Sequence, residues 1–337
     1  MSGGQGAYIF GCAGERLLPD EAAFFAQANP WGFILFARNI DNPDQLRRLT
    51  DDLRNAVGRD AVVTIDQEGG RVERMVQPHW RHWLPPLDQV AANPAAAQRS
   101  MYIRSRIIAD ELRGVGIDSN CSPCADVATP QTHAVLRNRC YGEDAGTVAS
   151  VGRAVADGLL DSGVLPVLKH IPGHGRATLD SHLELPRVSA KRVDLDAVDF
   201  AAMAALADLP LGMSAHIIYE DIDPNGPATT SPVMTRVIRE DIGFGGLLMT
   251  DDLSMEALDG DVTQRTRASL AGGMDMILHC NGELDEMAQV AAEAGMFRGG
   301  AQSRADAAIN MRKSPDSVDI LALEDELAHL IGGRNDD

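Results

Sequence analysis

Eight short apolar runs, separated by stretches with helical periodicity, are the feature of this sequence that most restricts its fold. Most of the runs are nearly continuous in hydrophobic residues, a pattern typical of parallel strands buried on both faces. They occupy residues 7–10, 32–37, 61–66, 117–123, 164–170, 211–217, 246–252 and 274–280. Amphipathic helices are predicted between them, for example over residues 43–56, 95–116, 147–163 and 234–244. This alternation predicts an α/β fold, a single (β/α)8 barrel of the TIM type.

The length of the chain agrees with one barrel. At 337 residues it lies within the range of about 200 to 400 residues that such barrels cover as one unit. We therefore predict a single catalytic domain over residues 1–337, with a last helix near 318–331 and a polar tail from about residue 300. An open, doubly wound sheet is the alternative, but no G-x-G-x-x-G motif follows the first run.

The charge and the cysteines restrict partners and compartment. A net charge of −19 disfavours nucleic acid and anionic membranes as partners. We find neither a signal-peptide pattern nor an apolar run of about 18 residues. The five scattered cysteines are typical of a reducing compartment, and we predict a cytoplasmic monomer. Cys121 and Cys124 form a C-x-x-C without a second ligand pair at zinc-finger spacing, so no metal and no cofactor are predicted.

Polar side chains gather where four of the apolar runs end. They are residues 66–71, Lys169–His170, His216 and Asp251–Asp252. In a barrel the carboxyl ends of the strands meet at one face, and active sites are built there. The sequence therefore predicts a site at this face. Because side chains alternate along a strand, only one of Asp251 and Asp252 is expected to point into the barrel mouth, and the alternation does not say which.

The loop after the fifth run, residues 171–182, holds a second candidate group. Asp180 and His182 lie two positions apart, so the carboxylate has the reach to orient the imidazole. Such a dyad suits general acid–base chemistry near neutral pH. The alternative is that Asp180 caps a local turn and His182 lies on the surface, and the spacing alone fits both.

At these residues the sequence resembles glycoside hydrolase family 3, in particular the single-domain bacterial β-N-acetylglucosaminidases of cell-wall recycling. The most specific match is LKHIPGHG at 168–175 followed by DSH at 180–182. Further matching segments span most of the chain in the order of the family, namely GFILFARNI (32–40), IDQEGGRVERM (65–75), LRNRCYGED (136–144) and MTDDLSMEA (249–257).

The resemblance implies a retaining exo-glycosidase that releases terminal β-linked N-acetylglucosamine. It implies that Asp251 is the nucleophile, that His182 is the acid/base and that Asp180 orients His182. Residues implied to hold the sugar hydroxyls are Asp66, Arg74, Arg139, Lys169 and His170. Cys140 and Tyr141 depart from the small residue and phenylalanine that are common in the family. For a cytosolic member the implied substrates are N-acetylglucosaminyl muropeptides, although the sequence carries no signature for the aglycone or the acetamido group.

Three other activities fit parts of the pattern. A histidine acid/base does not repel phosphate, so phosphorolysis is an alternative to hydrolysis. Lys169 at a strand end is also where a Schiff-base lyase would carry its amine, but His170 and the PGHG loop have no part in that chemistry. A non-catalytic sugar-binding barrel would dispense with Asp251 or His182, and this chain has both.

Overall fold

The computed structural model describes residues 4–179 and 184–332, and its centre is a sheet of eight parallel strands. Neighbouring strands follow the order β10-β1-β2-β3-β4-β5-β7-β9, and a parallel bridge between Met249 and Met276 joins the two ends of this order. The sheet therefore closes into a barrel, which confirms the predicted fold. Its strands are β1 Gly6–Gly11, β2 Pro30–Leu35, β3 Val62–Ile65, β4 Ser119–Asn120, β5 Leu165–Ile171, β7 Leu211–Ser214, β9 Leu247–Met249 and β10 Ile277–His279.

Each strand corresponds to one of the eight apolar runs, because both faces of the sheet are buried. In β1, Ile9 packs with Leu165 and Leu211 inside the barrel, while Tyr8 and Phe10 pack into the outer core under the helices. A strand with apolar contacts on both sides has no position for a solvent-facing polar residue. The continuous hydrophobic runs are the result.

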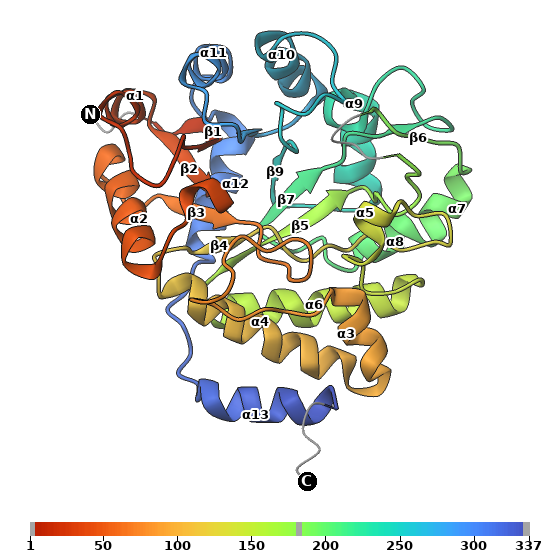
Figure 1. Ribbon diagram of the computed structural model, residues 1–337. Helices are drawn as coiled ribbons and strands as arrows, with labels where there is room; N and C mark the ends of the chain where they lie inside the picture. The colour runs from red at the N-terminus through yellow and green to blue at the C-terminus, as the bar shows by residue number, and fades with distance from the viewer. Residues whose placement is uncertain (1–3, 180–183, 333–337) are drawn as a thin grey trace.

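A ring of helices surrounds the barrel, with a small sheet of β6 (Arg187–Val188) and β8 (Ile218–Tyr219) beside it (Figure 1). The predicted helix at 234–244 is α9, which continues as a π-helical turn over Val237–Asp241. In the described part of the chain, no helix has both the length and the apolar character to span a membrane. The helices are α1 Pro19–Ala28, α2 Pro43–Val57, α3 Pro86–Ala92, α4 Ala97–Arg113, α5 Ala134–Arg137, α6 Ala145–Asp161, α7 Arg192–Ala197, α8 Asp199–Ala204, α9 Pro232–Arg236, α10 Val262–Gly272, α11 Leu284–Ala294, α12 Gly299–Asn310 and α13 Ile320–Leu330.

The two C-terminal helices pack at different places on the barrel. Ala305 and Ala308 of α12 pack with Trp31 and Leu247, at the starts of β2 and β9, in the interior of the barrel. The helix α12 thus closes the amino end of the barrel and leaves the carboxyl end open. The helix α13 lies outside against α4 (Figure 1), where Arg99 makes a bidentate ion pair with Glu326.

The close approach of α6 to α4 depends on Gly158. A Cβ at this position would lie 2.6 Å from the carbonyl oxygen of Tyr102 and 2.9 Å from Cβ of Ser105. We expect Gly158→Ala to lower the free energy of unfolding by roughly 1–3 kcal/mol, because overpacking outweighs the helix propensity that alanine adds. Chemical denaturation measures this. Gly300→Ala in α12, where the new Cβ meets only the tip of Arg304, is the control and should not destabilise. Equal stability of both variants would contradict the prediction.

Candidate active site

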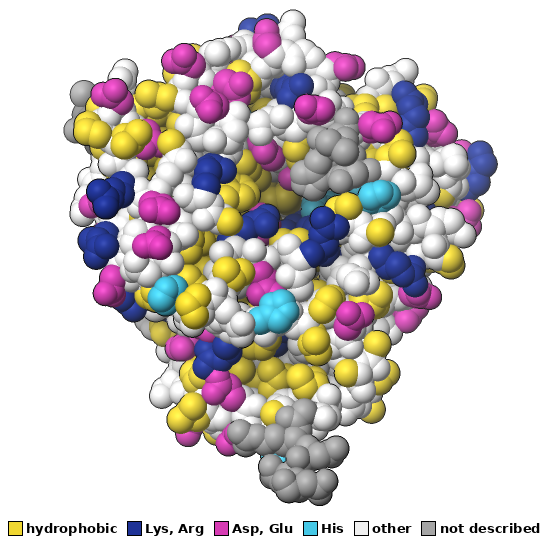
Figure 2. Space-filling view, viewed as in Figure 1, with side chains coloured by type: hydrophobic (Ala, Val, Ile, Leu, Met, Phe, Trp, Pro, Cys, Tyr) yellow, Lys and Arg dark blue, Asp and Glu magenta, His cyan; other side chains and the backbone are white. Residues whose placement is uncertain are grey.

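A cavity of about 380 Å³ opens at the carboxyl end of the barrel. Figure 2 shows this face, with a hollow near the middle of the molecule and Lys and Arg side chains in and beside it. Six of the eight predicted site residues line the cavity, whereas Asp180 and His182 lie outside the described residues. The six are Asp66, Arg74, Arg139, Lys169, His170 and Asp251.

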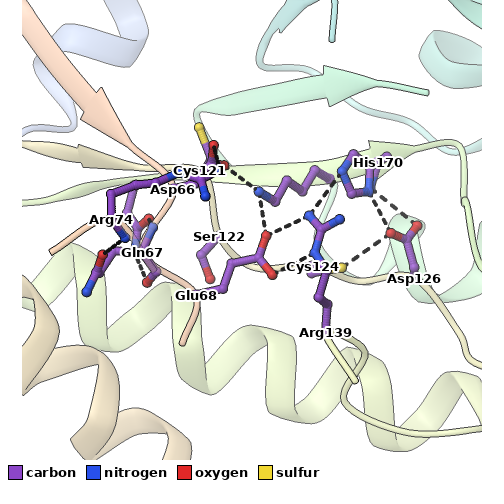
Figure 3. A network of polar contacts seen from close by, with 12 residues as sticks. Asp66, Gln67, Glu68, Arg74, Cys121, Ser122, Cys124, Asp126, Arg139 and His170 are labelled. Carbon is purple, nitrogen blue, oxygen red and sulfur yellow. Dashed lines mark hydrogen bonds and ion pairs between the residues drawn. The ribbon is translucent and has the colours of Figure 1, made fainter. Parts of the chain in front are cut away.

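A buried network of alternating charges forms one wall of the cavity (Figure 3). Lys169 Nζ lies 2.8 Å from Asp66 Oδ1 and 2.6 Å from Glu68 Oε1. Arg139 donates to both oxygens of Glu68, at 2.7 and 2.9 Å, and Arg74 donates to Asp66 Oδ2 at 3.2 Å. The side chains of Lys169 and Glu68 are each 2% exposed. Opposite charges that are this close and shielded from water attract strongly, so they hold one another in fixed positions.

These contacts set the protonation states of the network. Burial alone would raise the pKa of Asp66 and Glu68, but Lys169 and Arg139 lower both pKa values well below the ordinary range, and Arg74 adds to this effect on Asp66. Burial alone would also lower the pKa of Lys169, but Asp66 and Glu68 raise it above its ordinary value. Lys169 is therefore an ammonium ion, which is a poor nucleophile for a Schiff base.

The network continues through His170 to a buried aspartate. Asp126 Oδ2 lies 2.7 Å from His170 Nδ1, and Arg139 Nη2 lies 3.4 Å from His170 Nε2. Because arginine only donates, Nε2 of His170 is the acceptor. The ring proton is therefore on Nδ1, which donates a hydrogen bond to Asp126. His170 and His174 lower the pKa of Asp126 against the effect of its burial. Asp126 thus fixes both the tautomer and the orientation of the His170 ring.

Both aspartates after β9 line the cavity, and their hydrogen bonds distinguish them. The strand ends at Met249, so the alternation of side chains stops before Asp251 and Asp252. The carboxylate of Asp252 accepts the backbone N–H groups of Ser254 and Cys280 and the hydroxyl of Ser254. Asp251 Oδ1 accepts the N–H of Asp252 at 2.8 Å. The hydrogen bonds of Asp252 direct its oxygens to the backbone, which favours Asp251 as the reactive carboxylate.

His216, also predicted from a run end, supports this turn from below. Its Nε2 donates to the carbonyl of Asp252 at 3.1 Å, and its Nδ1 accepts from the Thr229 hydroxyl at 2.7 Å. Burial lowers its pKa, so the ring is neutral. His216 does not line the cavity and instead fixes the backbone that carries Asp251 and Asp252.

The glycine-rich loop after β5 is anchored at its first half. His174 lines the cavity, its N–H donates to Asp126 Oδ1 at 2.6 Å, and burial lowers its pKa to about 4. Gly175 is packed so closely that a Cβ would lie 1.8 Å from the carbonyl oxygen of Val127. Gly175 therefore allows close packing against the loop that carries Val127.

Sequence reasoning placed Glu68 in the polar group 66–71 without giving it a role, and it missed Asp126; the two neutralise and orient the predicted residues. Glu68 had a usable signal, because it lies two positions after Asp66 at the same strand end. Asp126 follows a two-residue strand by several residues and had no such signal. Tyr141, a departure from the family pattern, accepts the N–H of Cys124 and leaves Arg139 in place on Glu68.

The C-x-x-C pair does not form a shared metal site. The thiol of Cys121 lies against Thr64, whereas Cys124 donates to Asp126 Oδ2 at 3.3 Å. Cys124, Asp126 and His170 bring three donor atoms within 4.8 Å of one another. A metal ion there would have to displace the Nδ1 proton of His170 while Arg139 still donated to Nε2. The residues fit a hydrogen-bonded triad better than a set of metal ligands.

Acid should weaken the fold through this network. The lowered pKa values of Asp66, Glu68 and Asp126 stabilise the native state above the unfolded-state pKa of about 4, and this stability is lost as the pH falls. His174, with a pKa of about 4, acts in the same direction. We expect the free energy of unfolding to fall by more than about 2 kcal/mol between about pH 7 and pH 3.5. Urea denaturation at several pH values measures it, and a flat profile would contradict the assignment.

Acidic and basic side chains around one cavity at the carboxyl end of the strands are typical of the active site of a TIM-barrel enzyme. The model of the glycosyl hydrolase family 3 N-terminal domain matches residues 17–308. The chain therefore belongs to glycoside hydrolase family 3, and it is a glycoside hydrolase.

Individual relatives give the same result. A β-hexosaminidase of Alkalilimnicola ehrlichii is 36% identical over 285 residues, which are 82% of this chain and 81% of that protein. The structure of NagZ from Neisseria gonorrhoeae with N-trifluoroacetyl-D-glucosamine has a TM-score of 0.85 and 28% identity, over 98% of both chains. A family 3 β-N-acetylglucosaminidase from Paenibacillus has a TM-score of 0.80 and 28% identity. The match covers 96% of this chain and only 61% of that longer protein.

Proposed function

We propose that this chain is a β-N-acetylhexosaminidase that releases terminal β-linked N-acetylglucosamine with retention. The observation that carries the proposal is the position of Asp251 in a cavity whose wall is the buried network around Asp66 and Lys169. The names of its relatives and the N-trifluoroacetyl-D-glucosamine bound by the Neisseria protein support the choice of sugar.

The network would hold the sugar through its hydroxyl groups. Carboxylates accept from hydroxyls and cations donate to them, and such charge-assisted hydrogen bonds are stronger than neutral ones. Asp66, Lys169 and Arg139 are held by one another before a ligand arrives, so little ordering is left for the binding step. Because α12 closes the other end of the barrel, a chain would enter with its terminal sugar first, as an exo-acting enzyme requires.

Two successive displacements at the anomeric carbon would give retention. Asp251 attacks this carbon and forms a glycosyl–enzyme ester, while His182 protonates the departing glycosidic oxygen. His182 then takes a proton from water, which attacks the same anomeric carbon, displaces the Asp251 carboxylate and releases the sugar. Asp180 would hold the His182 tautomer. These two roles rest on the family motif, because both residues lie outside the described part of the chain.

We further assign N-acetylglucosaminyl muropeptides as substrates and the cytoplasm as the compartment. The muropeptides follow from the resemblance to recycling enzymes. The compartment is supported by the five cysteines, all of which are buried and free thiols.

The test is turnover of 4-nitrophenyl N-acetyl-β-D-glucosaminide compared with the plain β-glucoside. We expect turnover of the N-acetyl sugar alone, and free N-acetylglucosamine as the product in phosphate buffer. If the product is N-acetylglucosamine 1-phosphate instead, the enzyme is a phosphorylase and not a hydrolase. No turnover of either substrate would overturn the proposal.

A further inference from the structure

Arg71 is presented to the cavity by a tight turn that the sequence Gly69-Gly70 makes possible. Gly69 and Gly70 have φ values of 103° and 64°, and the N–H groups of Glu68 and Gly69 both donate to the carbonyl of Val72. A Cβ on Gly70 would lie 2.8 Å from Cα of Pro85. The turn is packed from below, so its position relative to the cavity is fixed.

The guanidinium of Arg71 differs from the other cations of the cavity. Lys169, Arg139 and Arg74 each pair with a carboxylate of the wall. Arg71 lines the cavity but is exposed, and within residues 4–179 and 184–332 it forms no ion pair or side-chain hydrogen bond. Its donors are available to a ligand.

A second donor, His133, lines the same cavity. It stands at the start of α5, where its Nδ1 accepts the N–H of Val135 at 3.3 Å. In the neutral ring the proton is then on Nε2, which is a donor. Arg71 is exposed and His133 is half-buried, whereas Lys169 and Glu68 are buried. Arg71 and His133 therefore lie nearer the mouth than the network assigned to the sugar.

In an exo-glycosidase the mouth holds the aglycone, since the terminal sugar takes the inner part. An anionic aglycone approaching a protein of net charge −19 is repelled on average. A cation without a carboxylate partner at the mouth opposes this repulsion locally and has donors to spare for a carboxylate.

We propose that Arg71, assisted by His133, binds a carboxylate of the aglycone and makes the enzyme selective for anionic leaving groups. This inference rests on the proposed hexosaminidase function and deepens it. It assigns to Arg71 a part in substrate selection and none in the chemistry at the anomeric carbon.

The experiment compares two N-acetyl-β-D-glucosaminides, of neutral 4-methylumbelliferone and of 3-carboxyumbelliferone. The quantity measured is the ratio of kcat/KM for the carboxylated over the neutral substrate, which cancels changes common to both. We expect Arg71→Gln to lower this ratio roughly fivefold to tenfold, as for loss of a charge-assisted hydrogen bond near solvent. Added NaCl should lower the ratio for the unmodified protein and change it little in Arg71→Gln.

Arg48→Gln is the matched control. Arg48 is also exposed and without an ion pair in the described chain, but it lies on α2 and not at the cavity. An unchanged ratio in Arg71→Gln, or an equal fall in Arg48→Gln, would overturn the role of Arg71 while the hexosaminidase activity stood. No turnover of either substrate by the unmodified protein would overturn both proposals.

Discussion

Replacing Asp251 by alanine is expected to lower kcat/KM on 4-nitrophenyl N-acetyl-β-D-glucosaminide on the order of 10³-fold or more, because it removes the proposed nucleophile. The side chain lies at the surface of the cavity rather than in the core, so the fold should survive. Azide fits the vacated space and should restore part of the turnover. The product would be the α-glycosyl azide, because a single displacement inverts the anomeric centre.

Asp252 supplies the control for this prediction. Its carboxylate binds the N–H groups of Ser254 and Cys280, so Asp252→Ala should lower the free energy of unfolding by about 1–3 kcal/mol. Azide should not restore its activity. If azide restores the Asp252 variant and the Asp251 variant is fully active, then Asp252 is the nucleophile and Asp251 is not.

The fold could be predicted because burial leaves its mark on every strand. Ile9 and Phe10 face opposite cores, yet both are hydrophobic, and the same holds along the other runs. The limits of the strands were less accessible. Run 117–123 contains only the two-residue strand Ser119–Asn120. The length of this strand is set by its hydrogen bonds to β3 and β5 and not by its own hydrophobicity.

The residue pattern alone predicted the site only at strand ends, and the resemblance added Arg74 and Arg139, which also line the cavity. Asp66 and Lys169 stand at such ends, 103 residues apart in sequence, and the closed sheet brings them together. Strand alternation did not decide between Asp251 and Asp252, because the choice depends on β9 ending at Met249 and on the donors around Asp252, and only the family resemblance implied Asp251. The partnership of Glu68 with Arg139 depends on a long loop that no periodicity describes.

The second large effect is expected at Glu68, a residue that does not line the cavity. Glu68→Gln keeps the shape of the side chain but removes the charge that Lys169 and Arg139 share. Removing one partner of a buried ion pair costs about 3–5 kcal/mol, since the remaining charges stay buried without compensation. We expect a fall of this size in the free energy of unfolding, measured by urea denaturation.

Glu73→Gln tests whether the effect belongs to the network or to the loop. Glu73 lies in the same loop, and its side chain is 3% exposed. Burial raises its pKa, and its ion-pair partner is the exposed His82 rather than a buried cation. The same substitution there should change the free energy of unfolding by less than about 1 kcal/mol. If Glu68→Gln costs no more than this, Glu68 does not hold the two cations together.

The kinetic constants of Glu68→Gln show whether Glu68 positions the cations that contact the sugar or only stabilises the fold. Lys169 would keep Asp66 as a partner, whereas Arg139 would lose its two charge-assisted hydrogen bonds. In the proposed function, sugar hydroxyls contact these cations both before and during bond cleavage, so KM should rise together with a fall in kcat. Glu68→Asp restores the charge and should recover part of the stability. A variant with lower stability but unchanged KM and kcat would show that the network supports the barrel and does not position the sugar.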